Sequence, residues 1–349
     1  MKRTIVRACL ALFAAPAVAL FVEAAAAFPR EAPEDTRKSP SGVFSLLVDN
    51  DLFAGTDRRY TNGAKAVWVT PELGRPGAPL KLPRWLDYLS RRLPPLPPAR
   101  ARRYLSIFLG QSIYTPDDIN RTEVAAGERP YAGYTYFGLG FHARDADSMD
   151  TLELNLGLVG PHSLAGDTQR LWHKIFGFIP PRGWAHQLRD EPVLGIAYDH
   201  KEKALLVRRD SGFGEDVIVH AGASLSNAWT AGHFGIEARA GWNLPRDFGS
   251  ARIQPGADSD SLFEERGIYG FLAAEGYAVL RDIFLDGNTF GDGPRVEKFP
   301  FRSEITAGFA VRFKRLKFSY GYVFGSRQFE TEKRGHIYGN INISFTFRN

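Results

Sequence analysis

A cluster of oxygen-bearing side chains closes one apolar segment of the chain and opens the next. Asn50 and Asp51 end an apolar run at 43–51, and Thr61 lies at the start of the run at 60–70. Hard cations such as Ca²⁺ bind about six to eight oxygen atoms from carboxylates, amides, hydroxyls and carbonyls. If the two runs form a hairpin, its tip brings Asp51 near Thr61 and can supply several of these oxygens. An ordinary solvated turn is the alternative, because Asp, Asn and Gly are common turn formers.

A second group of polar residues lies on a helix predicted at 163–177. Gln169 and His173 are four residues apart and therefore share one face of that helix. Histidine is the usual general base near neutral pH, and a polar neighbour can fix which ring nitrogen carries the proton. The chain contains 8 histidines, most of which we expect to be structural, so a structural role for His173 is the alternative.

Several familiar catalytic motifs are absent from the sequence. It contains no Gly-x-Ser-x-Gly elbow, no His-Glu-x-x-His pair and no phosphate-binding loop. An attack by water that a histidine activates therefore fits the sequence better than a serine triad does. A triad assembled from residues far apart in the chain stays open as an alternative.

The elements that must position these residues show a period of two. In the segment 152–158 every second residue is leucine, and Glu, Asn and Gly lie between them. The segments 316–324 and 341–347 alternate in the same way, with many aromatic residues on the apolar side. Apolar residues facing out and polar residues facing in, over about ten residues a segment, are typical of a transmembrane barrel. Strands of a soluble sandwich alternate too, but they average about half that length.

The number of such segments predicts the architecture. We predict an all-β fold, a transmembrane antiparallel β-barrel of about 12 strands with a short helix in an outer-rim loop. The strands are expected near 43–51, 60–70, 103–111, 132–143, 150–159, 192–207, 215–226, 233–244, 267–285, 300–313, 316–328 and 336–347. The 26 Phe, 13 Tyr, 6 Trp and 35 Gly suit the aromatic girdles and strand glycines of such a barrel.

Two intervals interrupt the alternation. Residues 71–101 are rich in proline around a short amphipathic piece at 85–93, and we interpret them as a structured connection. Residues 163–177 are the predicted helix. If the N-terminus is periplasmic, odd-numbered strands run outward, and both groups of polar residues then gather at the outer rim. This orientation makes 71–101 an unusually long periplasmic connection, since short turns are the rule there.

The N-terminus predicts the compartment. Three basic residues precede an apolar stretch at 8–22 and a run of alanines that ends at Ala27, which is the pattern of a secretory signal. A membrane anchor is the alternative, but the stretch is short for one and is broken by Pro16. We therefore predict a signal peptide at 1–27 and a single outer-membrane barrel domain at 28–349.

Charge and cysteine content narrow the range of partners and chemistry that we expect. The net charge of +5 includes +3 and −1 from the predicted signal peptide, so the mature chain carries about +3. This charge is too mild to indicate a nucleic-acid partner, although it suits a surface rich in anionic phosphates. Cys9 is the only cysteine and lies in the predicted signal peptide, so the mature chain has no thiol chemistry. Arg58, Arg59 and Arg129 near the outer rim are candidates for binding lipid phosphates, with solvated loop charges as the alternative. No pattern implies an oligomer.

Taken together, these motifs resemble the outer-membrane lipid A 3′-O-deacylase family of Gram-negative bacteria. The matching stretches occur in the family's order across nearly the whole mature chain, at 50–51, 60–63, 110–116, 128–133, 157–161, 169–177 and 285–290. The resemblance implies a twelve-stranded barrel in the outer membrane with its active site near the outer rim. It also implies calcium-dependent hydrolysis of an ester-linked 3′-acyloxyacyl chain, with lipid A or lipopolysaccharide as the partner.

The resemblance also implies roles for individual residues. Asn50, Asp51 and Thr61 look like the family's cluster around a calcium ion, and Gln169 and His173 look like its helix pair. By this resemblance His173 deprotonates a water that attacks the ester carbonyl. Calcium, held partly by Asp51 and Thr61, then stabilises the oxyanion, and Asn50 helps to position the ester.

One departure from the family pattern affects the helix pair. The family has an acidic residue six positions after the histidine, where this chain has Ile179. Glu191 is a candidate substitute for that residue. Two alternatives to an enzyme stay open. Polar inward faces that simply line water would make a non-enzymatic outer-membrane pore, and the departure at Ile179 leaves open a structural barrel with a degenerate site.

Overall fold

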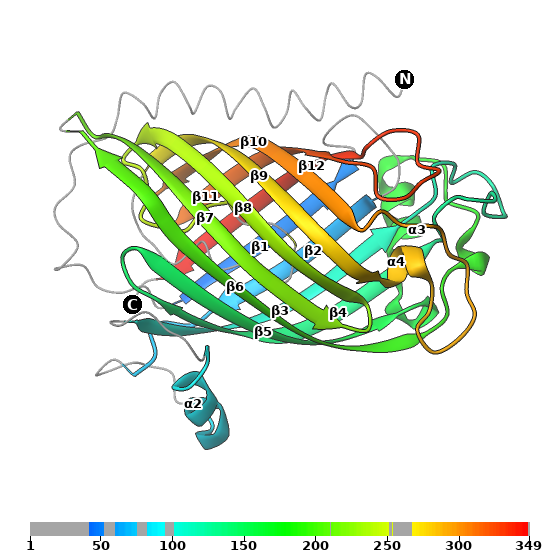
Figure 1. The fold of residues 1–349 in the computed structure, drawn as a ribbon, viewed down its shortest axis with the longest axis horizontal. Coiled ribbons are helices and arrows are strands. Elements are labelled where there is room, and N and C mark those ends of the chain that lie inside the picture. The colour runs from blue at the N-terminus through cyan, green and yellow to red at the C-terminus, as the bar shows by residue number, and fades with distance from the viewer. Residues whose placement is uncertain are drawn as a thin grey trace.

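The structure, a computed structural model, describes residues 42–51, 60–74, 82–94, 101–209, 211–250, 253 and 267–347. These residues form a closed barrel of twelve antiparallel strands, in which each strand pairs with its neighbours in sequence and β1 closes the barrel against β12 (Figure 1). The prediction of an all-β antiparallel barrel of about 12 strands is therefore confirmed. The predicted signal peptide at 1–27 lies outside the described residues.

The elements follow the chain in simple order. The strands are β1 (Gly42–Asn50), β2 (Tyr60–Val69), β3 (Arg102–Tyr114), β4 (Ala132–Arg144), β5 (Ser148–Val159), β6 (Glu191–Arg208), β7 (Phe213–Ser226), β8 (Trp229–Trp242), β9 (Gly267–Asp282), β10 (Phe301–Phe313), β11 (Leu316–Gly325) and β12 (Ile337–Phe347). The helical elements are α2 (Arg84–Ser90), η3 (Pro161–Ser163), α3 (Ala165–Phe176), η4 (Trp184–His186) and α4 (Ile283–Asp286). Within the described ranges, no helix has the length and apolar character needed to cross a membrane.

Alternation along each strand separates a lipid-facing wall from a polar lumen. On β3, Ile107 and Leu109 are exposed on the outside, whereas Ser106, Phe108 and Ser112 point inward and are buried. The same parity holds on the neighbouring strands through the antiparallel register. An apolar outer surface around a polar interior is the arrangement that a bilayer requires of a barrel.

The two ends of the barrel differ in what they carry. Gly42 pairs with Phe347, so both described chain ends lie at one end, which we call the termini end. Strands β1, β3 and β5 all run from there to the opposite end, where α3 and α4 lie, and we call this the α3 end (Figure 1). The predicted gathering of the polar motifs at one rim is therefore confirmed by the topology.

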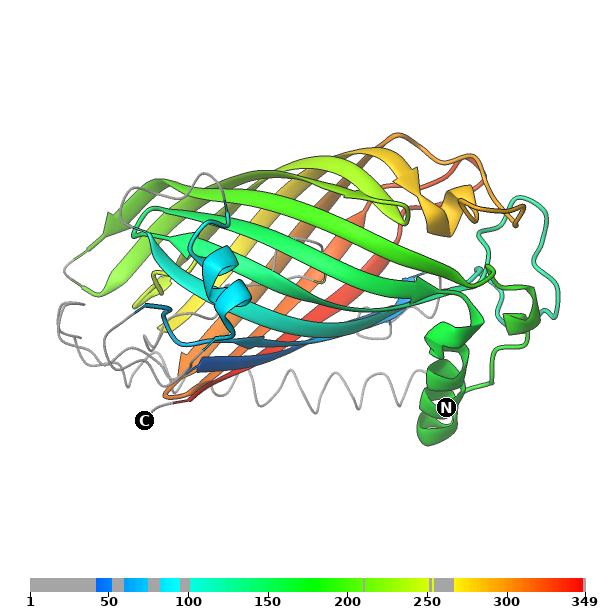
Figure 2. The same cartoon turned by 90° about the horizontal axis from the view of Figure 1, so that it is seen from below.

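Two helices lie outside the barrel wall, one near each end (Figure 2). Helix α2 belongs to the connection predicted as structured, and it leaves the barrel at the termini end. Its Leu86 packs against Leu105, Phe141 and Leu152, which occupy outward-facing positions of β3, β4 and β5. Helix α3 lies against the wall at the other end.

Some local boundaries differ from the sequence-based expectation, each for a physical reason. The ninth strand ends at Asp282, not at 285, because the Asp282 carboxylate accepts a hydrogen bond from the Phe284 N–H at 3.0 Å and caps α4. The helix predicted at 163–177 begins at Ala165, because Leu164 adopts a left-handed conformation with φ of 60°. That residue separates α3 from the short turn η3.

At the termini end a chain segment at 243–250, the plug segment, crosses the lumen. The Arg239 guanidinium of β8 binds the Asp216 carboxylate of β7 at 2.6 Å and also binds Asp247 of the plug segment. Lys317 of β11 binds the other Asp247 oxygen at 3.0 Å. Because β8 and β11 are not neighbours in the barrel, these contacts draw the plug segment across the interior. All four charged side chains are buried.

Candidate active site on the barrel wall

Helix α3 is anchored to the outer face of two strands. The Ser163 carbonyl accepts hydrogen bonds from the outward-facing Gln111 amide at 2.8 Å and Thr135 hydroxyl at 2.7 Å. Gly133 lies two residues before Thr135 on the same face of β4, and a Cβ added there would come within 2.2 Å of the Ala165 Cβ. Only glycine therefore lets the helix begin this close to β4. The helix is thus positioned on the lipid-facing side of the wall.

A small apolar core fixes the helix in place. Its members are Ile113, Ile119, Tyr131, Ala165 and Trp184. The Trp184 ring lies 5.2 Å from the Tyr131 ring, and its indole N–H donates to the Gln169 side-chain oxygen at 2.7 Å. This bond fixes the orientation of the Gln169 amide, because only its oxygen can accept. The Gln169 amide nitrogen is buried and meets no acceptor within the described part of the chain, so it is available as a donor.

His173 lies one turn further along the same helix face and is also buried. Its Nδ1 lies 2.6 Å from the backbone carbonyl oxygen of Ile179. A carbonyl can only accept, so Nδ1 must carry the proton, and in the neutral ring Nε2 is then the basic nitrogen. The departure from the family pattern at Ile179 therefore concerns a side chain. The backbone of that residue still provides an acceptor that orients the imidazole.

The two faces of α3 differ in polarity. Gln169 and His173 lie on the face turned toward the barrel, whereas Leu171, Ile175 and Phe176 are exposed on the face turned away. Exposed apolar side chains on the outside of a membrane barrel contact lipid. The polar pair therefore lies enclosed between the barrel wall and a helix whose outer face is apolar.

The oxygen cluster lies beside this helix around the wall. Asn50 and Asp51 are both buried, and Asn50 is opposite Asn62 in the β1–β2 register. Asn62 is in turn opposite Ile113, a member of the core beneath α3. The β2–β3 register shifts immediately before Asn62, which leaves Thr61 as the extra residue of a bulge. Bulges near functional sites re-aim a side chain and release backbone groups from the ladder.

The donor set of this cluster fits calcium. Asn50 offers an amide oxygen and Asp51 a carboxylate, and the bulge at Thr61 frees backbone groups beside them. All of these side-chain and backbone acceptors are hard oxygens, which is what Ca²⁺ binds. A buried carboxylate such as Asp51 is normally paired or bound to a cation, because burial removes its hydration. The position of the Thr61 side chain lies outside what the structure describes.

The three arginines predicted to bind phosphate do not share one location. Arg58 and Arg59 lie outside the described residues. Arg129 is buried, donates to the Gln328 side-chain oxygen at 3.3 Å and lies 5.0 Å above the Tyr114 ring. Burial lowers the pKa of Arg129. This residue lines the lumen and is not a solvated loop charge on the outer rim.

Glu191, the candidate substitute for the missing acidic residue, forms hydrogen bonds with residues other than His173. Its carboxylate accepts hydrogen bonds from the Asn227 amide at 2.8 Å and the Thr289 backbone N–H at 2.7 Å. It also accepts from Asn288 at 3.2 Å. Glu191 therefore ties the loop after α4 to the start of β6 and does not contact His173.

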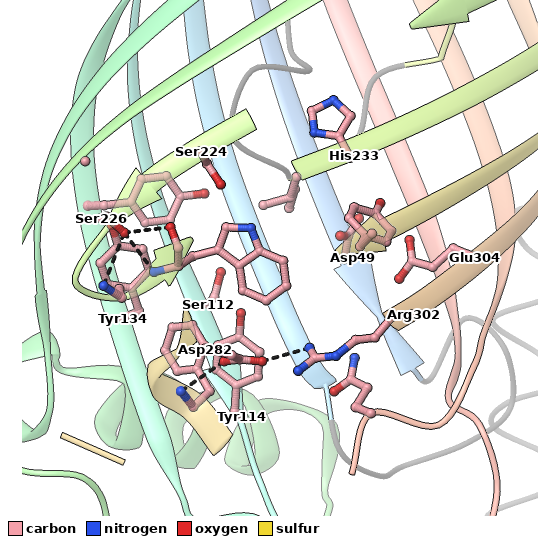
Figure 3. Close-up of a pocket in the computed structure, with 18 of the residues that line it drawn as sticks. Asp49, Ser112, Tyr114, Tyr134, Ser224, Ser226, His233, Asp282, Arg302 and Glu304 are labelled. Atoms are coloured by element: carbon pink, nitrogen blue, oxygen red, sulfur yellow. Dashed lines mark hydrogen bonds and ion pairs between the residues drawn. The ribbon is translucent and has the colours of Figure 1, made fainter. Parts of the chain in front are cut away.

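A cavity in the lumen, lined by both polar and apolar side chains, is separate from the polar pair on the wall (Figure 3). Asp282 and Arg302, on the adjacent strands β9 and β10, form an ion pair of 2.8 Å in its lining, and Tyr114, Tyr134 and Glu304 also point into it. Of the predicted site residues whose side chains the structure describes, Arg129 alone lines this cavity. The division follows from strand parity, since the lumen and the lipid-facing wall receive alternate residues.

Sequence reasoning missed the anchors of the site, although one signal was present. Gln111 and Thr135 occupy outward positions on β3 and β4, in register with each other, where a lipid-facing strand should be apolar. Two adjacent polar residues on such a face imply a protein cover, because unpaired polar groups are costly in lipid. That signal would have placed α3. No residue type could have indicated the backbone carbonyl of Ile179.

Fold and site together define an outer-membrane barrel with polar groups enclosed on its lipid-facing wall. The family model described as outer membrane protein LpxR matches residues 8–347, and the chain belongs to this family. Among solved structures the chain is similar to LpxR from Salmonella typhimurium, with a TM-score of 0.70, 18% identity, and coverage of 87% of this chain and 100% of that chain.

A more distant likeness is to the beta domain of the Bordetella autotransporter Brka, with a TM-score of 0.44 and 9% identity, covering 89% of this chain and 99% of that one. No curated protein matches the sequence. The family places the chain in the outer membrane, as predicted.

Proposed function

We propose that this chain hydrolyses the ester-linked 3′-acyloxyacyl chain of lipid A, in a calcium-dependent reaction in which His173 activates a water molecule. Membership of the LpxR family and the match to the Salmonella typhimurium structure support an outer-membrane lipid A deacylase role. The observation that carries the finer proposal is the bond from His173 Nδ1 to the Ile179 carbonyl. It leaves Nε2 as a basic nitrogen between the wall and a lipid-facing helix.

In the proposed reaction His173 takes a proton from water at Nε2 while the water oxygen bonds to the ester carbonyl carbon. The Nδ1–H bond to the Ile179 carbonyl stabilises the imidazolium that forms. When the tetrahedral intermediate collapses, the ester C–O bond breaks and the proton passes from Nε2 to the departing sugar alkoxide. Gln169, held by Trp184, can donate its amide N–H to the substrate.

The oxygen cluster has a separate part in this proposal. Asp51 and Thr61 would hold calcium, whose positive charge stabilises the developing oxyanion when it is bound. Asn50 would position the ester next to them. Arg58 and Arg59 would bind lipid phosphates from the adjoining loop. We do not assign Arg129 to this surface, because it lines the lumen.

The plug segment argues against the alternative of a passive pore. A passive pore needs a continuous water-filled lumen, whereas buried ion pairs draw residues 243–250 across this one. The alternative of a degenerate site is weakened in turn by the Ile179 carbonyl, which supplies the acceptor that the His173 ring needs.

Lipid A incubated with the refolded barrel, with calcium or with chelator, tests the proposal by mass spectrometry of the lipid. We expect loss of a whole acyloxyacyl unit only with calcium. The variant Asp51→Asn should need a higher calcium concentration, while Asp147→Asn, in an exposed turn at the termini end, should behave as wild type. Unchanged lipid from a barrel shown to be folded, or equal turnover in chelator, would contradict the proposal.

A further inference from the structure

Three side chains on adjacent strands converge inside the barrel, away from the proposed active site. Asp199 of β6, His220 of β7 and His233 of β8 each present a ligand atom, and these atoms lie within 4.8 Å of one another. His233 Nε2 is 2.9 Å and His220 Nδ1 is 3.6 Å from the same oxygen of Asp199. Figure 3 shows His233 on β8 beside the lumen cavity, which it helps to line.

Two glycines make room for the imidazoles. In the β7–β8 register His220 is opposite Gly235, and Gly222 is opposite His233. A Cβ at Gly235 would come within 2.2 Å of His220 Nε2, and one at Gly222 within 2.6 Å of His233 Cε1. Each ring therefore lies flat against the neighbouring strand, and any larger residue would displace it. The arrangement is built for this pair of rings and is not a chance approach of two histidines.

The carboxylate between the rings is incompletely satisfied by protein. Asp199 is 1% exposed, and its second oxygen has no hydrogen-bond partner among the residues that the structure describes. Both imidazoles are directed to the first oxygen. A buried carboxylate oxygen without a partner is unusual, because it has lost its water and gained nothing in return. A cation bound by the Asp199 carboxylate through both of its oxygens would remove this deficit.

Two buried side chains of opposite charge flank the three ligands. Lys201 is opposite His220 on one side, and Glu275 is opposite Gly235 on the other. Both side chains face the lumen and are buried. Their charges are opposite in sign, so together they add no net charge around the three ligands. Tyr277 of β9 continues the row on the far side of His233.

We propose that Asp199, His220 and His233 form a binding site for a single divalent transition-metal ion, with Zn²⁺ as the best fit. Two nitrogens and one carboxylate oxygen suit zinc, whereas calcium takes about six to eight oxygens. Zinc bonds of about 2.0–2.2 Å in a tetrahedron separate the ligand atoms by roughly 3.4 Å. The observed separations of 2.9 and 3.6 Å lie on either side of that value. The fourth position opens toward the lumen cavity, and the ion joins three consecutive strands.

The test is zinc binding by the full refolded barrel in metal-free detergent buffer, measured by isothermal titration calorimetry and elemental analysis. We expect one equivalent of Zn²⁺ for the wild type. The double variant H220A/H233A should bind at least about 100-fold more weakly, since losses of outer-shell partners alone cost about 10–100-fold in metal affinity. The matched control is His200→Ala, whose imidazole pairs with Asp150 on the outer wall at the same end of β6.

A second variant covers the case in which the double substitution fails to fold. Asp199→Asn keeps the size and one acceptor oxygen of the side chain but removes its charge, and it should also lose stoichiometric zinc. Co²⁺ added in place of zinc should give the visible absorption of a tetrahedral site in the wild type and not in Asp199→Asn. Zinc that persists in these variants and disappears in His200→Ala or His173→Ala would overturn the proposal. So would a folded wild type that binds no zinc.

Discussion

The barrel wall at the α3 end and the lumen at the termini end both enclose polar groups, but they do so with opposite results. At the α3 end, His173 and Gln169 lie outside the strands, and each keeps one hydrogen-bonding nitrogen unused by the groups that orient it. At the termini end, Arg239, Asp216 and Asp247 lie inside and satisfy one another. Burial of polar groups alone therefore does not mark a reactive site. A reactive site needs polar side chains that the fold orients and that keep a hydrogen-bonding atom unused.

The largest effect is expected from removing the imidazole of His173. His173→Ala should lower the rate of lipid A deacylation by about 10²–10⁴-fold, the usual contribution of a general base. The barrel should stay folded, because the apolar core beneath α3 does not include this ring. Product formation by mass spectrometry gives the rate, and heat-modified migration on a gel reports folding.

The matched control for that variant is His186→Ala, which removes an exposed histidine of η4 close to the same helix. It should retain full activity. A fully active His173→Ala would show that the orientation of this ring has no catalytic purpose, and the contrast between the two ends would then fail.

Breaking the ion pairs at the termini end should change stability without changing the chemistry. Arg239→Met leaves the buried Asp216 and Asp247 without their shared partner, which typically costs about 3–5 kcal/mol. Arg209→Met removes an exposed pair with Glu215 instead and should cost about 0–1 kcal/mol. Urea unfolding of the refolded barrels measures both. An Arg239→Met barrel as stable as the wild type would show that the plug segment is not held by these charges.

The same network predicts a dependence of stability on pH. Burial alone would raise the pKa of Asp247, but Lys317 and Arg239 outweigh it and lower that pKa below its ordinary value of 3.8. A depressed carboxyl pKa stabilises the fold above the ordinary value, and the benefit is lost as the pH falls toward the folded-state pKa. The stability difference between wild type and Asp247→Asn should therefore be constant at neutral pH and shrink below about pH 4.

A smaller effect is expected from the lipid-facing side of α3. Replacing both Leu171 and Ile175 by Asn removes exposed apolar surface, and we expect about a fivefold loss of activity on lipid vesicles, equivalent to about 1 kcal/mol of membrane contact. Lys174→Asn on the same helix is the control and should change little. Equal losses in both would point to damage to the helix instead of lost contact with lipid.

The smallest effect should come from Ile179, the residue that departs from the family pattern. Ile179→Ala keeps the backbone carbonyl that accepts from His173, so activity should change by less than about twofold. A large loss would mean that the isoleucine side chain itself places the substrate. The result therefore shows whether Ile179 acts only through its backbone carbonyl, which orients His173, or also through its side chain.

Much of the fold could be predicted because strand alternation in a barrel is a direct response to lipid and water. The leucines at every second position of 152–158 lie on the outer face, as expected, and Leu156 is exposed there. The same pattern did not indicate that Leu152 is covered, because α2 is distant in sequence and packs on β5 through tertiary contacts. Alternation gives the face of a residue but not what covers that face.

The site was predicted in part for a similar reason. Strand parity and helix spacing were sufficient to bring Asn50, Asp51 and His173 to one end of the barrel. They could not place Arg129, because loop residues have no parity, and this one folds inward over Tyr114. His220 and His233 looked unremarkable in sequence, since their convergence depends on the register of three strands.

Helices α2 and α3, attached outside the wall near opposite ends, have a consequence for how the molecule sits in a bilayer. Both project beyond the cylinder, and α2 exposes Trp85 and Tyr88, side chains that favour the boundary between water and lipid. Two helices attached in this way oppose movement of the barrel along the membrane normal. We therefore expect the depth of Gln169 and His173 in the membrane to be constant, so that in the proposed reaction an ester would be chosen by its depth below the headgroups. Turnover of one lipid in bilayers of increasing thickness would reveal that choice.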